Sequence, residues 1–213
     1  MSSDVLVTTP AQRQTEPHAE AVSRNRRQQA TFRKVLAAAM ATLREKSYAD
    51  LTVRLVAARA KVAPATAYTY FSSKNHLIAE VYLDLVRQVP CVTDVNVPMP
   101  IRVTSSLRHL ALVLADEPEI GAACTAALLD GGADPAVRAV RDRIGAEIHR
   151  RITSAIGPGA DPGTVFALEM AFFGALVQAG SGTFTYHEIA DRLGYVVGLI
   201  LAGANEPSTG GSE

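Results

Sequence analysis

The sequence is poor in several features that define whole classes of protein. Of its 213 residues only two are cysteines, Cys91 and Cys124, and none is tryptophan. Two cysteines cannot build a disulfide framework or a cysteine-rich zinc site, so we expect a reducing, cytoplasmic location. The 15 glycines and 11 prolines are too few for a collagen-like or a Pro/Gly low-complexity chain.

Long hydrophobic runs are also missing. The longest uninterrupted apolar stretch, residues 195–204, has about ten residues, whereas a membrane-spanning helix needs about 20. The first ten residues have neither the basic start nor the apolar core of a signal peptide. We therefore expect a cytoplasmic protein without a membrane partner.

Motifs for catalysis and metal binding are absent from the sequence. The five histidines form no HExxH motif, no ligand spacing with cysteine and no nucleophile motif. We therefore predict that the protein is not an enzyme and that it has no catalytic residues, no metal site and no cofactor. These histidines are His18, His76, His109, His149 and His187.

The formal net charge of zero conceals an asymmetry. Residues 1–90 carry 13 Lys and Arg against 7 Asp and Glu, a net charge of +6, and residues 91–213 carry the opposite excess. Such an asymmetry indicates that one half meets a polyanion, although a chance imbalance on two solvated faces explains the count equally well.

Apolar residues recur with helical spacing along most of the chain, and no convincing strand pattern appears. We therefore predict an all-α fold: an N-terminal three-helix helix-turn-helix domain, followed by a second helical domain. The predicted divisions are a disordered arm at 1–23, the first domain at 24–89, the second at 90–204 and a disordered tail at 205–213. The proline-rich segment 90–100 marks the boundary between the domains.

Residues 52–71 predict the helix-turn-helix itself. Thr52 is placed to cap a helix over 53–60, and the chain breaks at 61–63. Pro64 then opens a second short helix, and Ser72 or Ser73 caps the long helix that follows. A helix as short as the one from Pro64 to Phe71 fits the major groove of B-DNA, while its flanks hold phosphates.

The segment from Tyr48 to Leu77 resembles the DNA-binding domain of the TetR family of bacterial transcriptional regulators. The resemblance is strong over about residues 26–89 and architectural beyond them. It is carried by Thr52, Ala57, Ala60, Val62, Thr66, Tyr68, Tyr70, Phe71, Lys74 and Leu77.

The resemblance implies which residues contact DNA. Phosphate contacts are implied at Thr52, Tyr68, Tyr70 and Lys74, and base or groove contacts at Arg54, Pro64, Ala65, Thr66 and Thr69. Hydroxyl and ammonium groups suit phosphate oxygens. The exposed positions of the second helix offer no Arg, Asn or Gln, so we expect it to contact thymine methyl groups, with Arg54 as the candidate for a guanine contact.

Two further hypotheses concern these aromatic and basic residues. The rings of Tyr68 and Tyr70 can pack on the first helix while their hydroxyls contact DNA. Residues 24–27 hold three arginines that could reach a minor groove, or they could form a solvated face.

Three positions depart from the family pattern. Lys61 stands where a turn glycine is usual, Ala63 replaces the capping Ser or Thr, and Ala67 is smaller than the usual Leu or Ile. These departures keep an alternative function open: a helical small-molecule-binding or interaction module with a degenerate DNA-binding head.

For the second half, the resemblance implies a helical ligand-binding and dimerisation domain, and a homodimer in which the last two helices of each subunit form a four-helix bundle. It also implies a small-molecule effector that releases a repressor from a palindromic operator. The glycines that would allow close helix approach are Gly174, Gly194 and Gly198. Met170, Phe172, Phe173 and Leu176 suggest an apolar effector or plain core, and Arg102, Arg108, His109 and Gln178 are candidates for a polar head group. We assign no effector-binding residue from the sequence.

Overall fold

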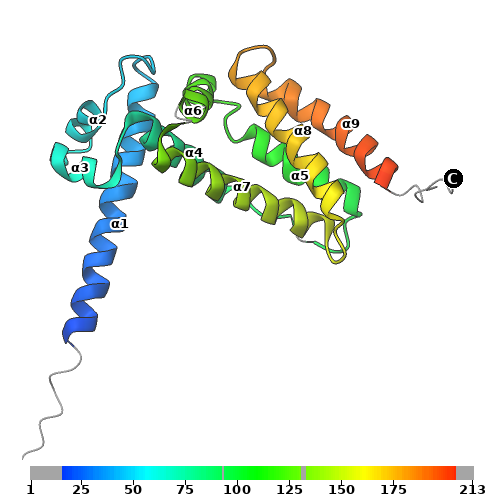
Figure 1. Ribbon diagram of the computed structural model, residues 1–213, viewed down its shortest axis with the longest axis horizontal. Coiled ribbons are helices and arrows are strands. Elements are labelled where there is room, and N and C mark those ends of the chain that lie inside the picture. The colour runs from blue at the N-terminus through cyan, green and yellow to red at the C-terminus, as the bar shows by residue number, and fades with distance from the viewer. Residues whose placement is uncertain (1–15, 93, 131–132, 205–213) are drawn as a thin grey trace, which may run out of the picture.

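The computed structural model describes residues 16–92, 94–130 and 133–204, and in these ranges it contains helices and no strands (Figure 1). The prediction of an all-α fold is confirmed. In chain order the helices are α1 (Glu16–Leu43), α2 (Val53–Arg59), α3 (Pro64–Tyr70), α4 (Lys74–Gln88), α5 (Met99–Leu112), α6 (Pro118–Asp130), α7 (Pro135–Ile156), α8 (Pro162–Gly180) and α9 (Tyr186–Ala204).

The first helix begins earlier than the sequence predicted. Helix α1 starts at Glu16, so residues 16–23 continue the helix and are not part of an arm. Their apolar residues lack a period, but alanine and glutamate are strong helix formers and Pro17 lies in the first turn, where proline is tolerated. The predicted arm at 1–15 and the tail at 205–213 lie outside the described residues.

The first three helices contribute one end of an apolar core that continues into the second half of the chain. Val35 of α1, Val56 of α2 and the C-cap Phe71 of α3 are fully buried. The ring of Phe71 stacks on Phe32 with centroids 5.1 Å apart. This packing fixes α3 against the other helices of the head, which consists of α1, α2 and α3, and leaves the outer face of α3 free.

The N-terminal caps of α2 and α4 follow the sequence prediction. The Thr52 hydroxyl accepts a hydrogen bond from the backbone N–H of Leu55, and the Ser73 hydroxyl accepts one from the N–H of His76. Helix α3 has no side-chain cap at Ala63, and Pro64 occupies its first turn. Proline compensates in part, because its fixed φ suits a helix start and its missing N–H needs no partner.

The turn between α2 and α3 holds a lysine in the left-handed region. Lys61 has φ 54°, a conformation that a residue with a Cβ adopts at a cost. We expect Lys61→Gly to raise the free energy of unfolding by about 1 kcal/mol. Urea unfolding measures the change, and Lys61→Ala is the control because it removes the charge and keeps the Cβ. Equal stabilisation by both variants would mean that the charge, and not the backbone, is unfavourable here.

Helix α4 is shared by the two halves of the molecule. It packs against α1 on the head side and against α6 and α7 on the other (Figure 1). In the second half α9 packs against α5 and α8, and the buried residues include Leu107, Ile148 and Phe172. A displacement of α4 therefore moves the head relative to the second half.

A buried arginine of α7 closes the C-terminal end of α4. Arg151 is 2% exposed, and its guanidinium donates to the carbonyl of Val89 at 2.8 Å and to that of Arg87 at 3.4 Å. It also pairs with Glu147 one turn earlier, which Arg150 contacts at 2.7 Å. Hydrogen bonds from Arg150 and Arg151 hold the pKa of Glu147 at about 2, against the opposing effect of burial.

This depressed pKa predicts a stability loss in acid. A carboxyl whose pKa is lower in the folded than in the unfolded protein stabilises the fold at pH values above its unfolded pKa, which is 4.5 here. This contribution is lost as the pH falls from there toward the folded pKa of about 2. We expect Glu147→Gln to flatten the pH dependence of the free energy of unfolding in this window. Urea unfolding of both proteins at about pH 5 and about pH 3 tests the effect. If the free energy of unfolding fell equally with pH in both proteins, carboxyls other than Glu147 would be responsible for the loss of stability in acid.

Helix α8 bears on the expectation, drawn from the sequence, that the chain has no membrane-spanning segment. Among the described helices it is long and apolar enough, by length and composition, to cross a membrane, although one such helix is weak evidence. The sequence search missed it because Glu169 interrupts the apolar run. Phe166 and Met170 on its outer side are exposed, whereas Val165, Leu168 and Phe172 are buried in the protein core.

Candidate nucleic-acid interface and effector cavity

Helix α3 presents its predicted contact residues on one exposed face. Pro64, Ala65, Thr66, Tyr68 and Thr69 are all exposed, and Ala67 between them is completely buried. The small Ala67 side chain fits the core beneath the helix, so this departure from the family pattern does not disturb the exposed face.

The two tyrosines of α3 differ in their surroundings. Tyr68 is 51% exposed, with its ring available to a partner. Tyr70 is half-buried and meets the ring of Phe32 edge to face at a centroid distance of 6.1 Å. It also borders a surface groove together with Arg33. Tyr70 therefore packs against α1 as hypothesised, whereas Tyr68 does not lie in the core.

Two predicted contact hydroxyls already have partners within the chain. The oxygen of Thr52 accepts from the N–H of Leu55 at 3.1 Å, which leaves its hydrogen available. The hydroxyl of Thr69 donates to the carbonyl of Ala65 at 3.1 Å, which leaves its oxygen as an acceptor. A hydroxyl that already donates offers no hydrogen to a phosphate, so we expect Thr69 to contact a base edge or a methyl group.

Lys74 is held at the start of α4 by a residue that the sequence motif did not suggest. Its ammonium donates to the carbonyl of Tyr48 at 3.2 Å and lies 4.5 Å from the centroid of the Tyr48 ring. The Tyr48 hydroxyl in turn donates to the Asn75 amide oxygen. These contacts position the ammonium, which has three donors and keeps two for another partner.

The basic residues of α1 and α2 are exposed around this face. Arg54 is exposed, and in the described part of the chain no hydrogen bond or ion pair is recorded for its side chain. Arg59, by contrast, pairs with Glu45 at 2.6 Å. Arg26 and Arg27 are exposed on helix α1 and not on an extended arm. A helix is too wide to enter a minor groove as an arm does, so the two possibilities that remain for these arginines are contact with phosphates and a solvated face.

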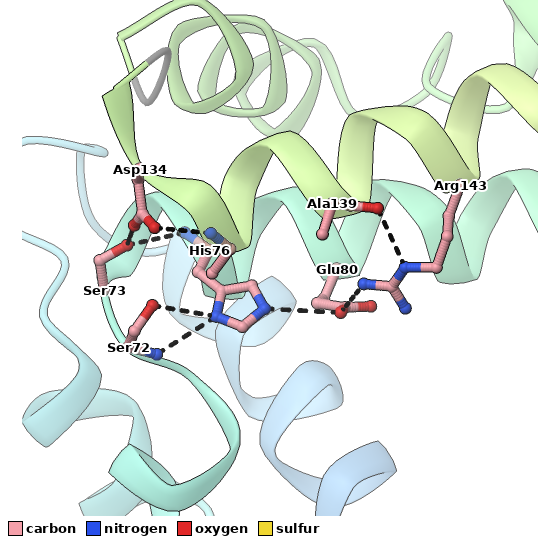
Figure 2. A network of polar contacts seen from close by, with 8 residues as sticks. Ser72, Ser73, His76, Glu80, Asp134, Ala139 and Arg143 are labelled. Atoms are coloured by element: carbon pink, nitrogen blue, oxygen red, sulfur yellow. Dashed lines mark hydrogen bonds and ion pairs between the residues drawn. The ribbon is translucent and has the colours of Figure 1, made fainter.

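The caps of α4 and α7 are joined by a hydrogen bond, as Figure 2 shows. The Ser73 hydroxyl donates to Asp134 at 2.9 Å while it accepts from the N–H of His76. Asp134 also accepts from the N–H of Ala136, which caps α7 as predicted. Three residues separate the end of α3 from the start of α4, which is therefore tied to the start of α7.

About two turns further along both helices, a charged group makes a second link between α4 and α7. Glu80 is 7% exposed, and it pairs with Arg143 of α7 and lies 3.5 Å from His76 (Figure 2). The N–H of Ser72 donates to Nδ1 of His76, which directs the other ring nitrogen to Glu80. Burial raises the pKa of Glu80, but hydrogen bonds from His76 and Arg143 outweigh it and hold the pKa below its usual value. The carboxylate thus stays charged and holds both helices.

A cavity of about 340 Å³ lies beside this junction, between α4, α6, α7 and α8. Its volume is at the lower end of the range of ligand pockets, about 300–1,000 Å³. Its lining is mainly apolar. The lining residues are Tyr82, Leu114, Cys124, Thr125, Leu128, Leu129, Arg141, Ile144, Phe173, Leu176, Val177 and Tyr186.

Of the apolar effector candidates from the sequence, Phe173 and Leu176 line this cavity. Phe172 is core, and Met170 is 57% exposed on the outer side of α8. Residues missed by sequence reasoning, among them Tyr82 and Arg141, come from helices far apart in the chain. No local motif could have brought them together.

The sequence suggested four polar residues for an effector head group, and two of them, Arg102 and Arg108, make contacts within the chain. Arg102 donates to the carbonyls of Val97, Ala155 and Ile156, and Arg108 pairs with Asp191. Gln178 borders a separate groove between α8 and α9, and His109 is exposed. None of the four is among the residues that line the described cavity.

Comparisons with known proteins agree with this arrangement. Residues 35–81 match the model of the bacterial regulatory proteins of the tetR family. A TetR transcriptional regulator from a Rhodococcus species has 22% sequence identity and a TM-score of 0.69, over 84% of this chain and 98% of that one.

Two further solved structures are repressors or regulators with a bound acyl-CoA. The FadR repressor of Thermus thermophilus, in complex with lauroyl-CoA, has 17% identity and a TM-score of 0.61, over 85% of this chain and 99% of that one. The FadR regulator of Bacillus subtilis, in complex with stearoyl-CoA, has 14% identity and a TM-score of 0.55, over 81% and 98%. Residues 35–81 therefore match the tetR-family model, in agreement with the resemblance found in the sequence, and the chain as a whole shares the fold of these solved regulators.

Proposed function

We propose that this protein is a cytoplasmic, ligand-responsive repressor that binds a palindromic operator as a homodimer. The observation that carries the proposal is the exposed face of α3, which holds Tyr68 and Thr69 outward over the buried Ala67. Exposed cations on α1 and α2 flank it. Pro64, Ala65, Thr66 and Thr69 on this face, with Arg54, supply the groove contacts. The phosphate contacts come from Thr52, Tyr68, Tyr70 and Lys74.

The surface of α8 and α9 supports the homodimer. Exposed apolar side chains recur along both helices: Phe166 63%, Met170 57%, Tyr195 72% and Leu199 56%. A Cβ added at Gly174 or Gly198 would meet nothing within 4 Å, so a partner helix has room there. Gly194 does not share this role, because it faces Thr104 of α5 in its own subunit. A second copy would cover the apolar face of α8 and set the two α3 helices about 34–36 Å apart.

The cavity beside α4 supports an effector that acts on this spacing. An effector relieves repression if it binds a released state better than the DNA-competent state. Tyr82 in the cavity wall lies half a turn from Glu80, which ties α4 to α7. Two structural neighbours hold acyl-CoA, a ligand with an apolar chain, and the lining of this cavity is likewise mainly apolar.

Selection of genomic fragments by the purified protein tests the proposal. At roughly physiological salt, weak nonspecific binding fades and specific sites survive. An enriched palindrome, with protein shown by sedimentation to be dimeric, is the expected result. Enriched sequences without two-fold symmetry would overturn the proposed dimer geometry.

A second candidate is a helical small-molecule-binding or interaction module with a degenerate head. The uncapped start of α3 and the strained Lys61 favour it. Folded, dimeric protein that enriches no fragment, alone or with cell extract metabolites added as co-ligands, would support this function and reject the repressor.

A further inference from the structure

The lining of the cavity between α4, α6, α7 and α8 is mainly apolar, and its polar residues are Tyr82, Cys124, Thr125, Arg141 and Tyr186. Tyr82, Cys124 and Ile144 are buried and form its floor, whereas Leu129 and Val177 are 59% and 44% exposed and form its mouth. Burial raises the pKa of the Cys124 thiol to about 12, so the floor holds no charge at neutral pH. A ligand must therefore be apolar over most of its length.

The floor carries an unsatisfied hydroxyl. Tyr82 is 3% exposed, and its hydroxyl is buried with no hydrogen-bond partner among the described residues. Leaving a buried hydroxyl unpaired costs stability, so such a group in a native protein calls for an explanation. An oxygen atom of a ligand in the cavity would provide the missing partner.

Arg141 is the one charged residue among the lining residues in the described structure. It is half-buried, and no hydrogen bond or ion pair within the described residues is recorded for it. Its neighbours on α7 behave differently, because Arg143 pairs with Glu80 and Arg151 with Glu147. An unpaired guanidinium on an apolar cavity is suited to a carboxylate, which it can bind with two parallel hydrogen bonds.

We infer that the effector is a small carboxylic acid with an apolar body, whose carboxylate pairs with Arg141 and whose distal oxygen hydrogen-bonds with Tyr82. The apolar body lies against Phe173 and Leu176 of α8. Such a ligand joins α4 to α7 next to the Glu80–Arg143 pair, and thereby changes the position of α4. Its role as an effector rests on the proposed function, whereas its binding does not.

Calorimetric titration without DNA tests the carboxylate. The probes are hexanoate, octanoate and decanoate, together with the amides and primary amines of the same chain lengths. We expect the best carboxylate to bind at least tenfold more tightly than its amide or amine. Arg141→Gln should remove this preference and leave amide binding unchanged, whereas Arg138→Gln, an exposed arginine of the same helix, should preserve it. Equal affinity for acid and amide, or no binding by any carboxylate, would overturn the inference.

The ω-hydroxy acids of the same chain lengths test Tyr82. One of them should bind several-fold more tightly than its parent acid, and Tyr82→Phe should abolish that gain. The Tm of unliganded Tyr82→Phe should equal or exceed that of the native protein, because the hydroxyl lost has no partner. A lower Tm, or no gain from any hydroxy acid, would show that Tyr82 is a structural residue and not a ligand contact.

A parallel gel-shift assay separates this inference from the proposed function. Carboxylate binding that depends on Arg141 but leaves protein–DNA complexes intact would support the site and contradict an effector role. DNA binding at a palindrome without any carboxylate affinity would support the repressor and overturn the site.

Discussion

Replacing Arg151 with Met is expected to lower the free energy of unfolding by about 3 kcal/mol. Met matches the apolar stem in volume but removes the donors that reach the carbonyl of Val89 and the carboxylate of Glu147. Both acceptors lie where little water can replace the lost hydrogen bonds. Urea unfolding at neutral pH, followed by circular dichroism, measures the loss.

Arg150 provides a matched control for this substitution. It pairs with the same Glu147, but its side chain is 55% exposed. An exposed ion pair contributes about 1 kcal/mol or less, so Arg150→Met should cost far less than Arg151→Met. If the two variants lost equal stability, the effect would come from the charge on Glu147 and not from the carbonyls at the end of α4.

Placing a carboxylate on α3 is expected to reduce operator affinity by about 100-fold or more. Ala65 is exposed in the first turn of α3, so Ala65→Glu sets a negative charge where the proposed operator approaches. The fold should tolerate the change, because an acidic residue near a helix N-terminus is favourable. Fluorescence anisotropy with the selected operator measures the affinity, and thermal unfolding confirms the fold.

Ala146→Glu is the control for the net charge, because Ala146 is exposed on α7, away from α3. It should change operator affinity only slightly, through the general field of the protein. An Ala65→Glu variant that binds as well as Ala146→Glu would exclude α3 as the element that enters the groove.

The local elements were predictable because their causes are local. Thr52, Ser73 and Asp134 each cap a helix through a backbone N–H two or three residues away, and Pro64 opens α3 from a first-turn position. The error at the start of α1 arose because a helix can form from residues of high propensity without an apolar period. The exposed positions of α3 that we propose as DNA contacts followed from a motif confined to a few turns.

The groups between helices were not predictable in this way. Phe173 and Leu176 were candidates by type, but their place in the cavity depends on how α8 packs beside α4 and α7. Arg102 and Arg108 were equally plausible by type, and they turned out to hold carbonyls and Asp191. A side chain's type states what it can bind, whereas its neighbours decide what it does bind.

The sequence by itself determined the helices, their caps, the strained turn at Lys61 and the exposed chemistry of α3, because each depends on residues within about one helical turn. Only the tertiary structure decided that Tyr82 and Arg141, 59 positions apart, share one cavity. It also decided that Glu80 and Arg151 tie α4 to α7. These contacts depend on how helices that are distant in the chain pack together, and this packing cannot be inferred from the spacing of residues in the sequence.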